Sequence, residues 1–160
     1  MIYVKIRKVT FPGKNPNLKE VEKYLNSELI QGYYVEETND YVRIGAKSVD
    51  EYCGSAYTKR LRGALLKAKA NAATVLPELI RTACNRRWLD NKAEKHSLNA
   101  SKGWYRYDVG FSIPVYDDNG RQMSENIYSA TLVARINDKG VFFHDVINIK
   151  KEASKPFESQ

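Results

Sequence analysis

The segment NIYSATLVARINDKGVFFHDVINI, residues 126–149, holds the residue types in this sequence best suited to acid–base chemistry. Its alternation of apolar and polar residues predicts two strands joined by a tight turn at NDKG. On one face of these strands His144 falls together with the hydroxyls of Ser129 and Thr131 and with Arg135. Histidine titrates near neutral pH, so it suits either role in proton transfer. His144 is therefore the first candidate for a catalytic residue.

The preceding segment WYRYDVGFSIPVY, residues 104–116, alternates in the same way and predicts another long strand. Its odd-numbered positions are aromatic or aliphatic, while the other face carries Trp104, Arg106, Asp108 and Ser112. On the last strand Asp145 interrupts the apolar pattern, as expected at a bulge or a strand end. The polar faces of the three strands together predict a donor-rich surface that contains one imidazole, and a merely solvated sheet face is the structural alternative.

Several kinds of chemistry are disfavoured by the sequence. It has no His, Cys and Asp cluster with metal-ligand spacing, so neither a metal nor another cofactor is expected. The glycines of GYYVEETNDYVRIG have the wrong spacing for a phosphate-binding loop. A Ser129–His144–Asp108 triad lacks the turn that normally presents the nucleophile. His96, in a polar stretch, is expected to be an exposed bystander.

Metal-free cleavage of RNA suits this face better. The attacking group is the 2′-hydroxyl of the RNA, and the protein supplies proton transfer and cations that stabilise the phosphate. His144 would transfer a proton, and Arg106 or Arg135 would bind the phosphate in a bidentate manner. Ser129 and Thr131 would donate hydrogen bonds to it. These residues form the predicted catalytic group.

The positive charge is concentrated in the middle of the chain. The net charge is +7, and residues 59–102 hold eleven Lys and Arg against three acidic residues. Such a block favours a polyanionic partner, with nucleic acid first, although a solubilised helix face gives the same pattern. An exposed Trp104 could stack on a base. The residues predicted to bind RNA are Arg60, Arg62, Arg86, Arg87, Trp104 and Arg135.

The order of elements predicts an α+β fold in a single domain, residues 1–155, followed by a frayed tail, residues 156–160. A short strand over residues 2–9 precedes a helix over 18–29, with Asn17 as its N-cap, and Ser48 is expected to cap a brief helix. A long helical region over 59–87 should break at Pro77, where a second helix starts. The later strands should form an antiparallel meander, with the helices covering its apolar face.

Nothing in the sequence predicts a membrane span or a signal peptide. No apolar run approaches the roughly 18 residues that a span requires, and the N-terminus lacks an apolar core. Cys53 and Cys84 show no short motif, which favours a reducing compartment. We expect a cytoplasmic protein, or one delivered into a target cell without a signal peptide.

Several segments together resemble a known family. They are VRIGAKSVDEY, VLPELIRTACNRRW, KGWYRYDVGFSIPVYDDNG and IYSATLVARINDKGVFFHDV. In their order along the chain and their pattern of residue types, they resemble a phage-associated nuclease domain of the barnase/EndoU/colicin/RelE-like group, in particular its third type. Domains of this group occur in large polyvalent phage proteins and polymorphic toxins. No single short motif carries the resemblance, which covers residues 41–156.

The resemblance implies N-terminal helices packed on one face of a four- or five-stranded antiparallel sheet, as in barnase or RelE. The open sheet face would cleave RNA without a metal, and His144, Ser129 and Thr131 would belong to that site. Lys59 and Arg60 match the place where the group has basic residues at the start of a helix. Many of these nucleases carry a further acid–base residue on the helical half, where this chain offers Tyr52, Tyr57 and Lys59.

Three functions follow from these features. The first is a metal-independent endoribonuclease of a phage or toxin type, acting on RNA through His144. The second is a nucleic-acid-binding module without catalysis. The third is an interaction domain of a mobile element, whose positive block meets an acidic partner such as an immunity protein. The sequence leaves the RNA target and the oligomeric state open.

Overall fold

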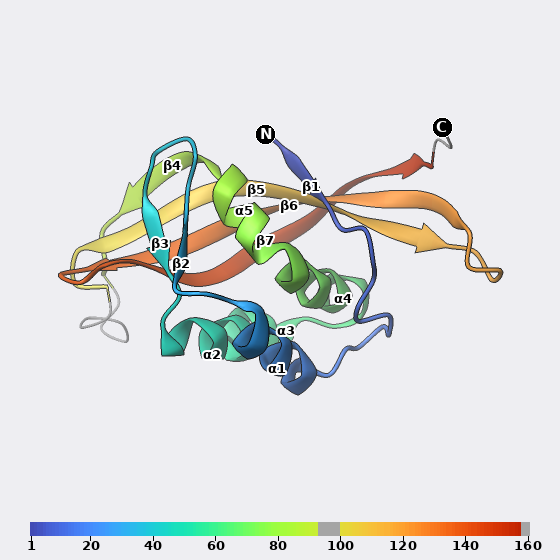
Figure 1. Cartoon of the computed structure of the whole chain (residues 1–160), viewed down its shortest axis with the longest axis horizontal. Helices are drawn as coiled ribbons and strands as arrows, with labels where there is room; N and C mark the ends of the chain where they lie inside the picture. The colour runs from blue at the N-terminus through green and yellow to red at the C-terminus, as the bar shows by residue number, and fades with distance from the viewer. Residues whose placement is uncertain (93–99, 158–160) are drawn as a thin grey trace.

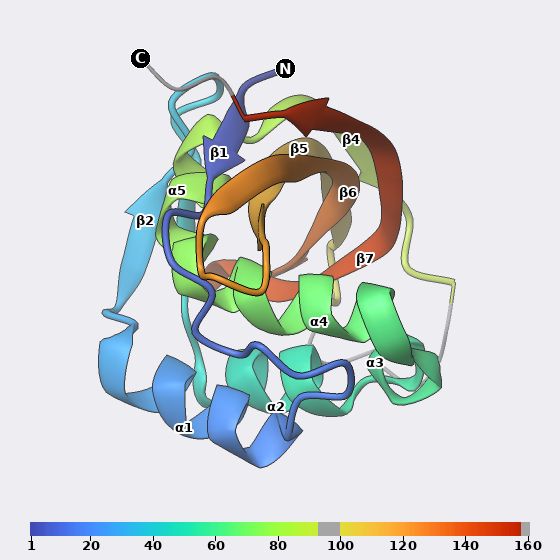
Figure 2. The ribbon, with the colours of Figure 1, turned by 90° about the vertical axis from the view of Figure 1, so that its right-hand side faces the viewer.

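The computed structural model describes residues 1–92 and 100–157 of the chain (Figure 1). Its centre is a mixed sheet with the strand order β1-β5-β6-β7-β3-β2, and β4 pairs with β5 off this path. The sheet curls into a half-barrel (Figure 2). The strands are β1 (Tyr3–Lys5), β2 (Gly32–Tyr34), β3 (Tyr41–Arg43), β4 (Cys84–Leu89), β5 (Gly103–Tyr116), β6 (Gln122–Asn137) and β7 (Gly140–Pro156).

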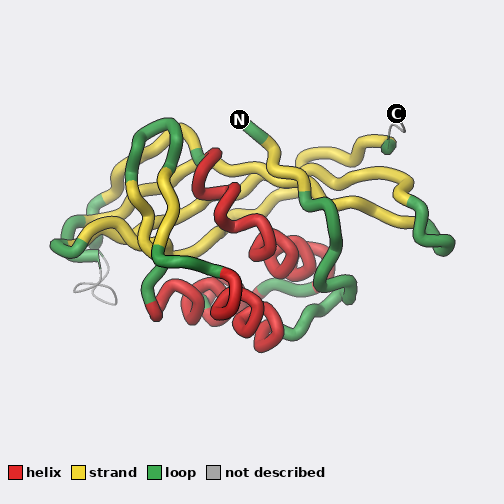
Figure 3. The backbone as a smooth tube through the Cα atoms, in the orientation of Figure 1, coloured by secondary structure: helices red, strands yellow, loops and turns green. Residues whose placement is uncertain are grey.

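The helices are α1 (Leu18–Glu28), α2 (Ala46–Gly54), α3 (Ala56–Arg60), α4 (Gly63–Ala72) and α5 (Leu76–Thr82), with a 3-10 turn η1 (Ala73–Val75) between the last two. α5 packs against β1, β2 and β5, while α2 packs against β7 and α1 packs on α2. The helices lie beside the middle of the long strands, whose far ends project beyond them (Figure 3). None of the helices in residues 1–92 and 100–157 has the length and apolar character that crossing a membrane demands.

The three long strands form as the alternation predicts. β5 pairs with β6, and β6 with β7, both antiparallel, and Asn137 faces Gly140 at the NDKG turn. The apolar faces are buried in the core, including Tyr107 and Phe111 of β5 and Leu132 of β6. Leu76, Leu79 and Ile80 of α5 join the same core. The predicted faces of β5 and β6 are confirmed. On β7 the register shifts against β6, so that Val146 joins the core and Ile147 does not, which is the reverse of the predicted alternation.

The expected sheet of four or five antiparallel strands, with helices on one face, is wrong. The sheet has seven strands, and it is mixed because β1 runs parallel to β5 and β3 parallel to β7. Strands β1, β2 and β3 have only three residues each, which is too short to show a period of two. The parallel partners also lie far apart in sequence, as with Tyr3 opposite Gly110.

Local signals explain most helix ends. Asn17 caps α1 as predicted, because its side chain accepts a hydrogen bond from the Lys19 amide. Pro77 lies in the first turn of α5, where its missing N–H costs nothing, and the expected break before it is present. The predicted helix over 59–87 ends early, however, and residues 84–89 form strand β4. Asn85 there takes a positive φ of 55°, which a helix does not allow.

Helix side chains cover the outer edge of β7. β3 pairs with β7 only at Val141 and Phe142. Beyond that point the Ser48 hydroxyl donates to the Phe143 carbonyl at 2.7 Å, and the Tyr57 hydroxyl accepts from the Ile149 amide at 2.9 Å. Ser48 lies inside α2, so the expectation that it caps this helix is wrong, and Gly45 is the cap. Side chains of the helical segment therefore bond to backbone groups of β7 that a neighbouring strand would otherwise pair with.

Ser48→Ala is expected to lower the free energy of unfolding by about 1–2 kcal/mol, because a buried hydroxyl with two partners is lost. The Ser48 oxygen accepts from the Gly45 amide at 3.0 Å and donates to Phe143, and the side chain is fully buried. Urea unfolding followed by circular dichroism measures the change. Ser27→Ala is the matched control, since the exposed Ser27 hydroxyl donates to the Tyr24 carbonyl. Equal losses in both variants would contradict the edge-covering role.

The C-terminal end of the chain belongs to the sheet as far as it is described. β7 continues to Pro156, and the Phe157 amide donates to the Met123 carbonyl at 2.9 Å. The predicted frayed tail, residues 156–160, thus begins on a strand residue, and residues 158–160 lie outside the described part. The division into one domain and a tail stays a prediction.

Candidate functional site

A cleft of about 460 Å³ lies between the α2–α3 corner and the sheet face opposite the core. The helices contribute Glu51, Ser55, Ala56 and Tyr57. The sheet contributes Trp104, Arg106, Val133, His144, Asp145 and Ile147, and the end of β4 adds Leu89 with residues 90–92. Three residues of the predicted site, namely His144, Arg106 and Trp104, therefore meet in one cleft.

A bulge in β7 places His144. Ala134 of β6 faces Phe143, and Val133 faces Asp145, so His144 is the extra residue between them. The interruption of the apolar pattern at Asp145 is therefore caused by a bulge, which is one of the two causes that the sequence predicted. The His144 side chain is 13% exposed, and its ring packs edge-on against Trp104 at 4.8 Å between centroids. A bulge re-aims a side chain in this way next to many active sites.

Glu51 of α2 faces the imidazole. Its Oε1 lies 3.7 Å from Nε2 of His144. This distance is too long for a hydrogen bond, but a carboxylate so close favours the cation that forms when the ring takes up a proton. The sequence did not single out Glu51, because an acidic residue on a short helix is common and nothing marks its approach to β7. His144 therefore has a carboxylate and an aromatic ring as neighbours, in a cleft that aliphatic side chains also line.

Arg106 of β5 and Lys92 at the end of the first described segment are the two basic residues that line the cleft. Arg106 faces Val133 across the β5–β6 ladder, and Val133 in turn faces Asp145. The Arg106 Nε is buried and has no hydrogen-bond partner among the described residues. A buried donor left in this state costs about 1–3 kcal/mol, so most such groups have a partner. Because Arg106 also lines the cleft, its guanidinium is suited to an anionic ligand there.

A buried ion pair supports the cleft from behind. Lys69 of α4 contacts Asp145 directly, donates also to the Val146 carbonyl, and lies 4.1 Å from the centre of the Tyr52 ring. Burial lowers the pKa of Lys69 and raises the pKa of Asp145, and each partner opposes the shift of the other. Because Asp145 is adjacent to His144, the pair fixes the backbone from which the imidazole projects.

Ser129 and Thr131 do not join His144. They line a separate pocket of about 440 Å³, together with Asp108 and Glu152. The Ser129 hydroxyl donates to Glu152 Oε1 at 2.6 Å. Ser129 is four residues from Val133 along β6, or about 13 Å at ~3.3 Å per residue. The structure therefore assembles neither the predicted group with both hydroxyls nor the Ser129–His144–Asp108 triad.

The basic residues of the middle block are spread over different elements. Lys59 and Arg60 are exposed at the end of α3, two and three residues after Tyr57, and neither lines the cleft. The exposed Arg62 donates to the Lys59 carbonyl. Lys69 of the same block is buried. None of these four residues lines the cleft.

The arginines predicted on the strands have protein partners. Arg86 Nη1 is 2.8 Å from Asp40, and Arg87 Nη1 is 3.1 Å from Asp108. Arg135 is only 6% exposed and donates to the Phe143 carbonyl at 3.1 Å. The predicted RNA-binding set thus divides into Trp104, which lines the cleft, and arginines that lie outside it.

No group of three or more His, Cys, Asp and Glu suited to a metal ion occurs in residues 1–92 and 100–157. His96 lies outside the described residues. Comparisons of the chain with models of known families, with curated proteins and with solved structures give no match in any of the three. The function of the cleft is therefore inferred from the geometry of its own residues.

Proposed function

We propose that the protein is a metal-independent endoribonuclease, in which the cleft lined by Glu51, Arg106 and His144 binds a phosphodiester of RNA. One observation supports this most: an imidazole, a carboxylate 3.7 Å from it and a guanidinium share one cleft. These three groups would supply proton transfer, stabilisation of the protonated imidazole and neutralisation of the phosphate charge. The net charge of +7 favours a polyanionic substrate.

His144 would accept the proton of the RNA 2′-hydroxyl, and Glu51 would stabilise the resulting imidazolium by its charge. The 2′-oxygen then attacks phosphorus and the bond to the 5′-oxygen breaks, which leaves a 2′,3′-cyclic phosphate. The leaving oxygen takes a proton from water. Arg106, which lines the cleft, would stabilise the negative charge that grows on the phosphate oxygens.

The aromatic and aliphatic side chains of the cleft suit a nucleobase. Trp104, Tyr57 and Leu89 line it beside the polar groups. A base can stack on an aromatic ring with a gain of about 1–3 kcal/mol, independent of its identity. By the resemblance of its sequence, we place the protein among phage or polymorphic-toxin nucleases acting in the cytoplasm, and an acidic immunity protein would be its natural partner.

His144→Ala is expected to lower the rate of RNA cleavage at least about 100-fold, the low end for lost acid–base catalysis. The assay follows a labelled single-stranded RNA in EDTA and identifies the terminal 2′,3′-cyclic phosphate. Ser129→Ala is the matched control, because Ser129 lies in the other pocket and bonds to Glu152. It should keep the wild-type rate within about twofold.

Full activity of His144→Ala would remove His144 from the mechanism. Cleavage that stops in EDTA and returns with Mg²⁺ would contradict a metal-independent reaction. RNA that is retarded in a gel but stays intact would favour the non-catalytic binding module, and failure to bind any RNA would favour the protein-interaction domain.

A further inference from the structure

A row of aromatic and arginine side chains crosses the sheet from the cleft. In the register of the strands Trp104 of β5 faces Arg135 of β6, Arg135 faces Phe142 of β7, and Phe142 faces Arg43 of β3. Paired residues on neighbouring strands point to the same side of a sheet. The row therefore alternates ring and guanidinium on the face that carries the cleft. Arg135 lies 5.1 Å from the centre of the Phe142 ring, so these two members are in contact.

Two tyrosines continue the row to the edge of the sheet. Arg43 lies 5.5 Å from the centre of the Tyr41 ring, two residues earlier on β3. Tyr41 faces Tyr34 of β2, and the two rings are 4.8 Å apart. Tyr34 is 57% exposed, whereas its neighbour Tyr33 points into the core. The aromatic–arginine row thus comprises Trp104, Arg135, Phe142, Arg43, Tyr41 and Tyr34.

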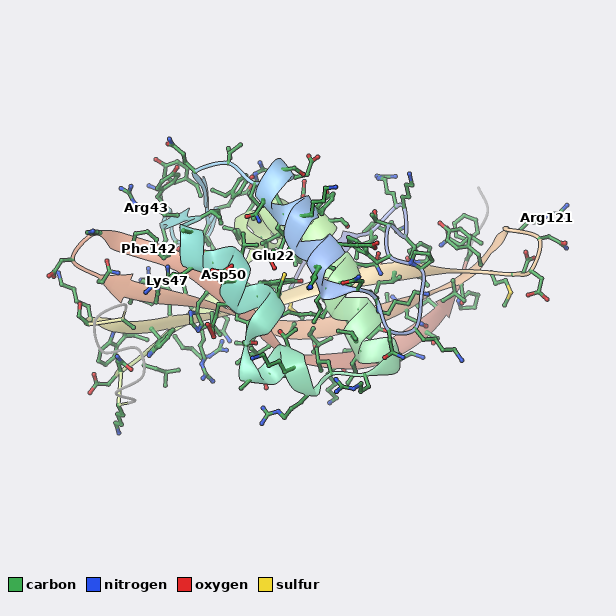
Figure 4. All side chains as sticks on the ribbon, turned by 90° about the horizontal axis from the view of Figure 1, so that it is seen from below. Glu22, Arg43, Lys47, Asp50, Arg121 and Phe142 are labelled. Carbon is green, nitrogen blue, oxygen red and sulfur yellow. The ribbon has the colours of Figure 1, made fainter. Side chains whose placement is uncertain are left out.

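Exposed positive charge accompanies the row at its outer end. Arg43 is exposed, and so is Lys47 in the first turn of α2. The view from below shows Arg43, Lys47 and Phe142 at the same end of the molecule (Figure 4). A Cβ at Gly45, which precedes α2, would lie 3.4 Å from the Phe142 ring, so the start of α2 borders the row. Lys139, in the turn between β6 and β7, is exposed as well.

We propose that the aromatic–arginine row binds single-stranded nucleic acid that leads into the cleft. Bases stack on aromatic rings without regard to sequence, and guanidinium groups both stack on bases and bind phosphate. The row spans five strands, or about 19 Å at ~4.8 Å between neighbouring strands. This is the length of about five stacked nucleotides at ~3.4 Å each. A duplex keeps its base faces stacked on one another, so it cannot use the rings. The assignment of RNA as the strand rests on the proposed function.

Two features indicate that single-stranded nucleic acid is the ligand of the row. The row is continuous with the cleft through Trp104, which belongs to both. Its exposed charged members, Arg43 and the bordering Lys47, are positive and complement a phosphate backbone. Arg135 is buried and bound to the Phe143 carbonyl, so it stiffens the row and presents the Phe142 ring. The contacts to the strand come from Tyr34, Tyr41, Arg43 and Phe142.

Tyr34→Ala is expected to weaken binding of a single-stranded RNA by at least about fivefold, the low end for the loss of one stacked base. Fluorescence anisotropy of a labelled 2′-O-methyl 12-mer measures the affinity without cleavage. Arg43→Ala should also weaken binding and reduce the slope of log affinity against log salt by about 0.7, the value for one phosphate contact on a single strand. Tyr34→Phe should bind as the wild type does, because the ring is kept.

Tyr116→Ala is the matched control, since Tyr116 is 43% exposed at the far end of β5. Wild-type binding by both Tyr34→Ala and Arg43→Ala would overturn the proposal, as would equal affinity for a duplex of the same length. The loss of RNA binding in Tyr116→Ala to the same degree would also overturn it. The binding test does not depend on catalysis. If the protein binds RNA through the row but cleaves none, the proposed nuclease activity is refuted and the proposed binding role of the row still stands.

Discussion

Lys69→Met is expected to lower the free energy of unfolding by about 3–5 kcal/mol, because Asp145 remains buried without its cation. The side chain of Lys69 is fully buried and that of Asp145 is 3% exposed. Lys69 also donates to the Val146 carbonyl and contacts the Tyr52 ring. A domain with about 5–15 kcal/mol of total stability loses a large part of it by this change. Urea unfolding followed by tyrosine and tryptophan fluorescence measures the effect.

Two further variants identify the cause. Lys67→Met changes a half-buried lysine on the same helix and should stay within about 0.5 kcal/mol of the wild type. The double variant Lys69→Met with Asp145→Leu removes both charges, and such replacements are often neutral within about 1 kcal/mol or even stabilising. It should therefore recover much of the loss. A single variant as stable as the wild type would show that the pair does not hold this part of the core.

Arg106→Ala is expected to lower the rate of RNA cleavage by about 10²–10³, as the loss of one preorganised donor to a developing oxyanion does. Its effect on unfolding should be small, because the buried Arg106 Nε has no hydrogen-bond partner among the described residues. Arg106→Lys should not restore the rate, since an ammonium group lacks the bidentate geometry. Single-turnover cleavage with saturating enzyme separates this loss from weaker binding.

Arg87→Ala provides the comparison. Arg87 lies directly across the β4–β5 ladder from Arg106 and forms an ion pair with Asp108. The Arg87→Ala substitution removes the same charge from the same sheet face, but from outside the cleft. The rate of RNA cleavage should therefore change by less than about fivefold. Equal losses in Arg87→Ala and Arg106→Ala would mean that general positive charge, and not one placed donor, promotes cleavage.

Alternation in the sequence was sufficient to predict the three long strands and the faces of β5 and β6, but the bulge at His144 reverses the predicted faces of Val146 and Ile147 on β7. Tyr107, Phe111 and Leu132 are buried as a period of two requires. The short strands escaped prediction because three residues carry no period, and because parallel pairing with β5 or β7 joins distant segments. β4 was taken as the end of a helix, since the basic pair Arg86 and Arg87 suits either structure.

The candidate site was predictable only as far as it lies on one sheet face. His144, Arg106 and Trp104 share that face, and the cleft brings them together. Glu51 could not be found, because its approach to His144 depends on how α2 packs on β7. Ser129 was placed on the correct face, but pleating says nothing of the distance along a strand, and its hydroxyl serves Glu152 instead.

The way the helices bond to β7 also bears on whether a second copy of the chain could pair with this strand. Up to Ile149 the outer edge of this strand is occupied by the hydroxyls and the ammonium group described above, so a second chain finds no bare backbone there. From Lys150 to Pro156 no described strand pairs with that edge. The stretch carries Lys150, Lys151 and Lys155 and ends in a proline, which repel or interrupt an approaching copy. Neutralising these lysines should make the isolated protein prone to form fibrils through its last strand.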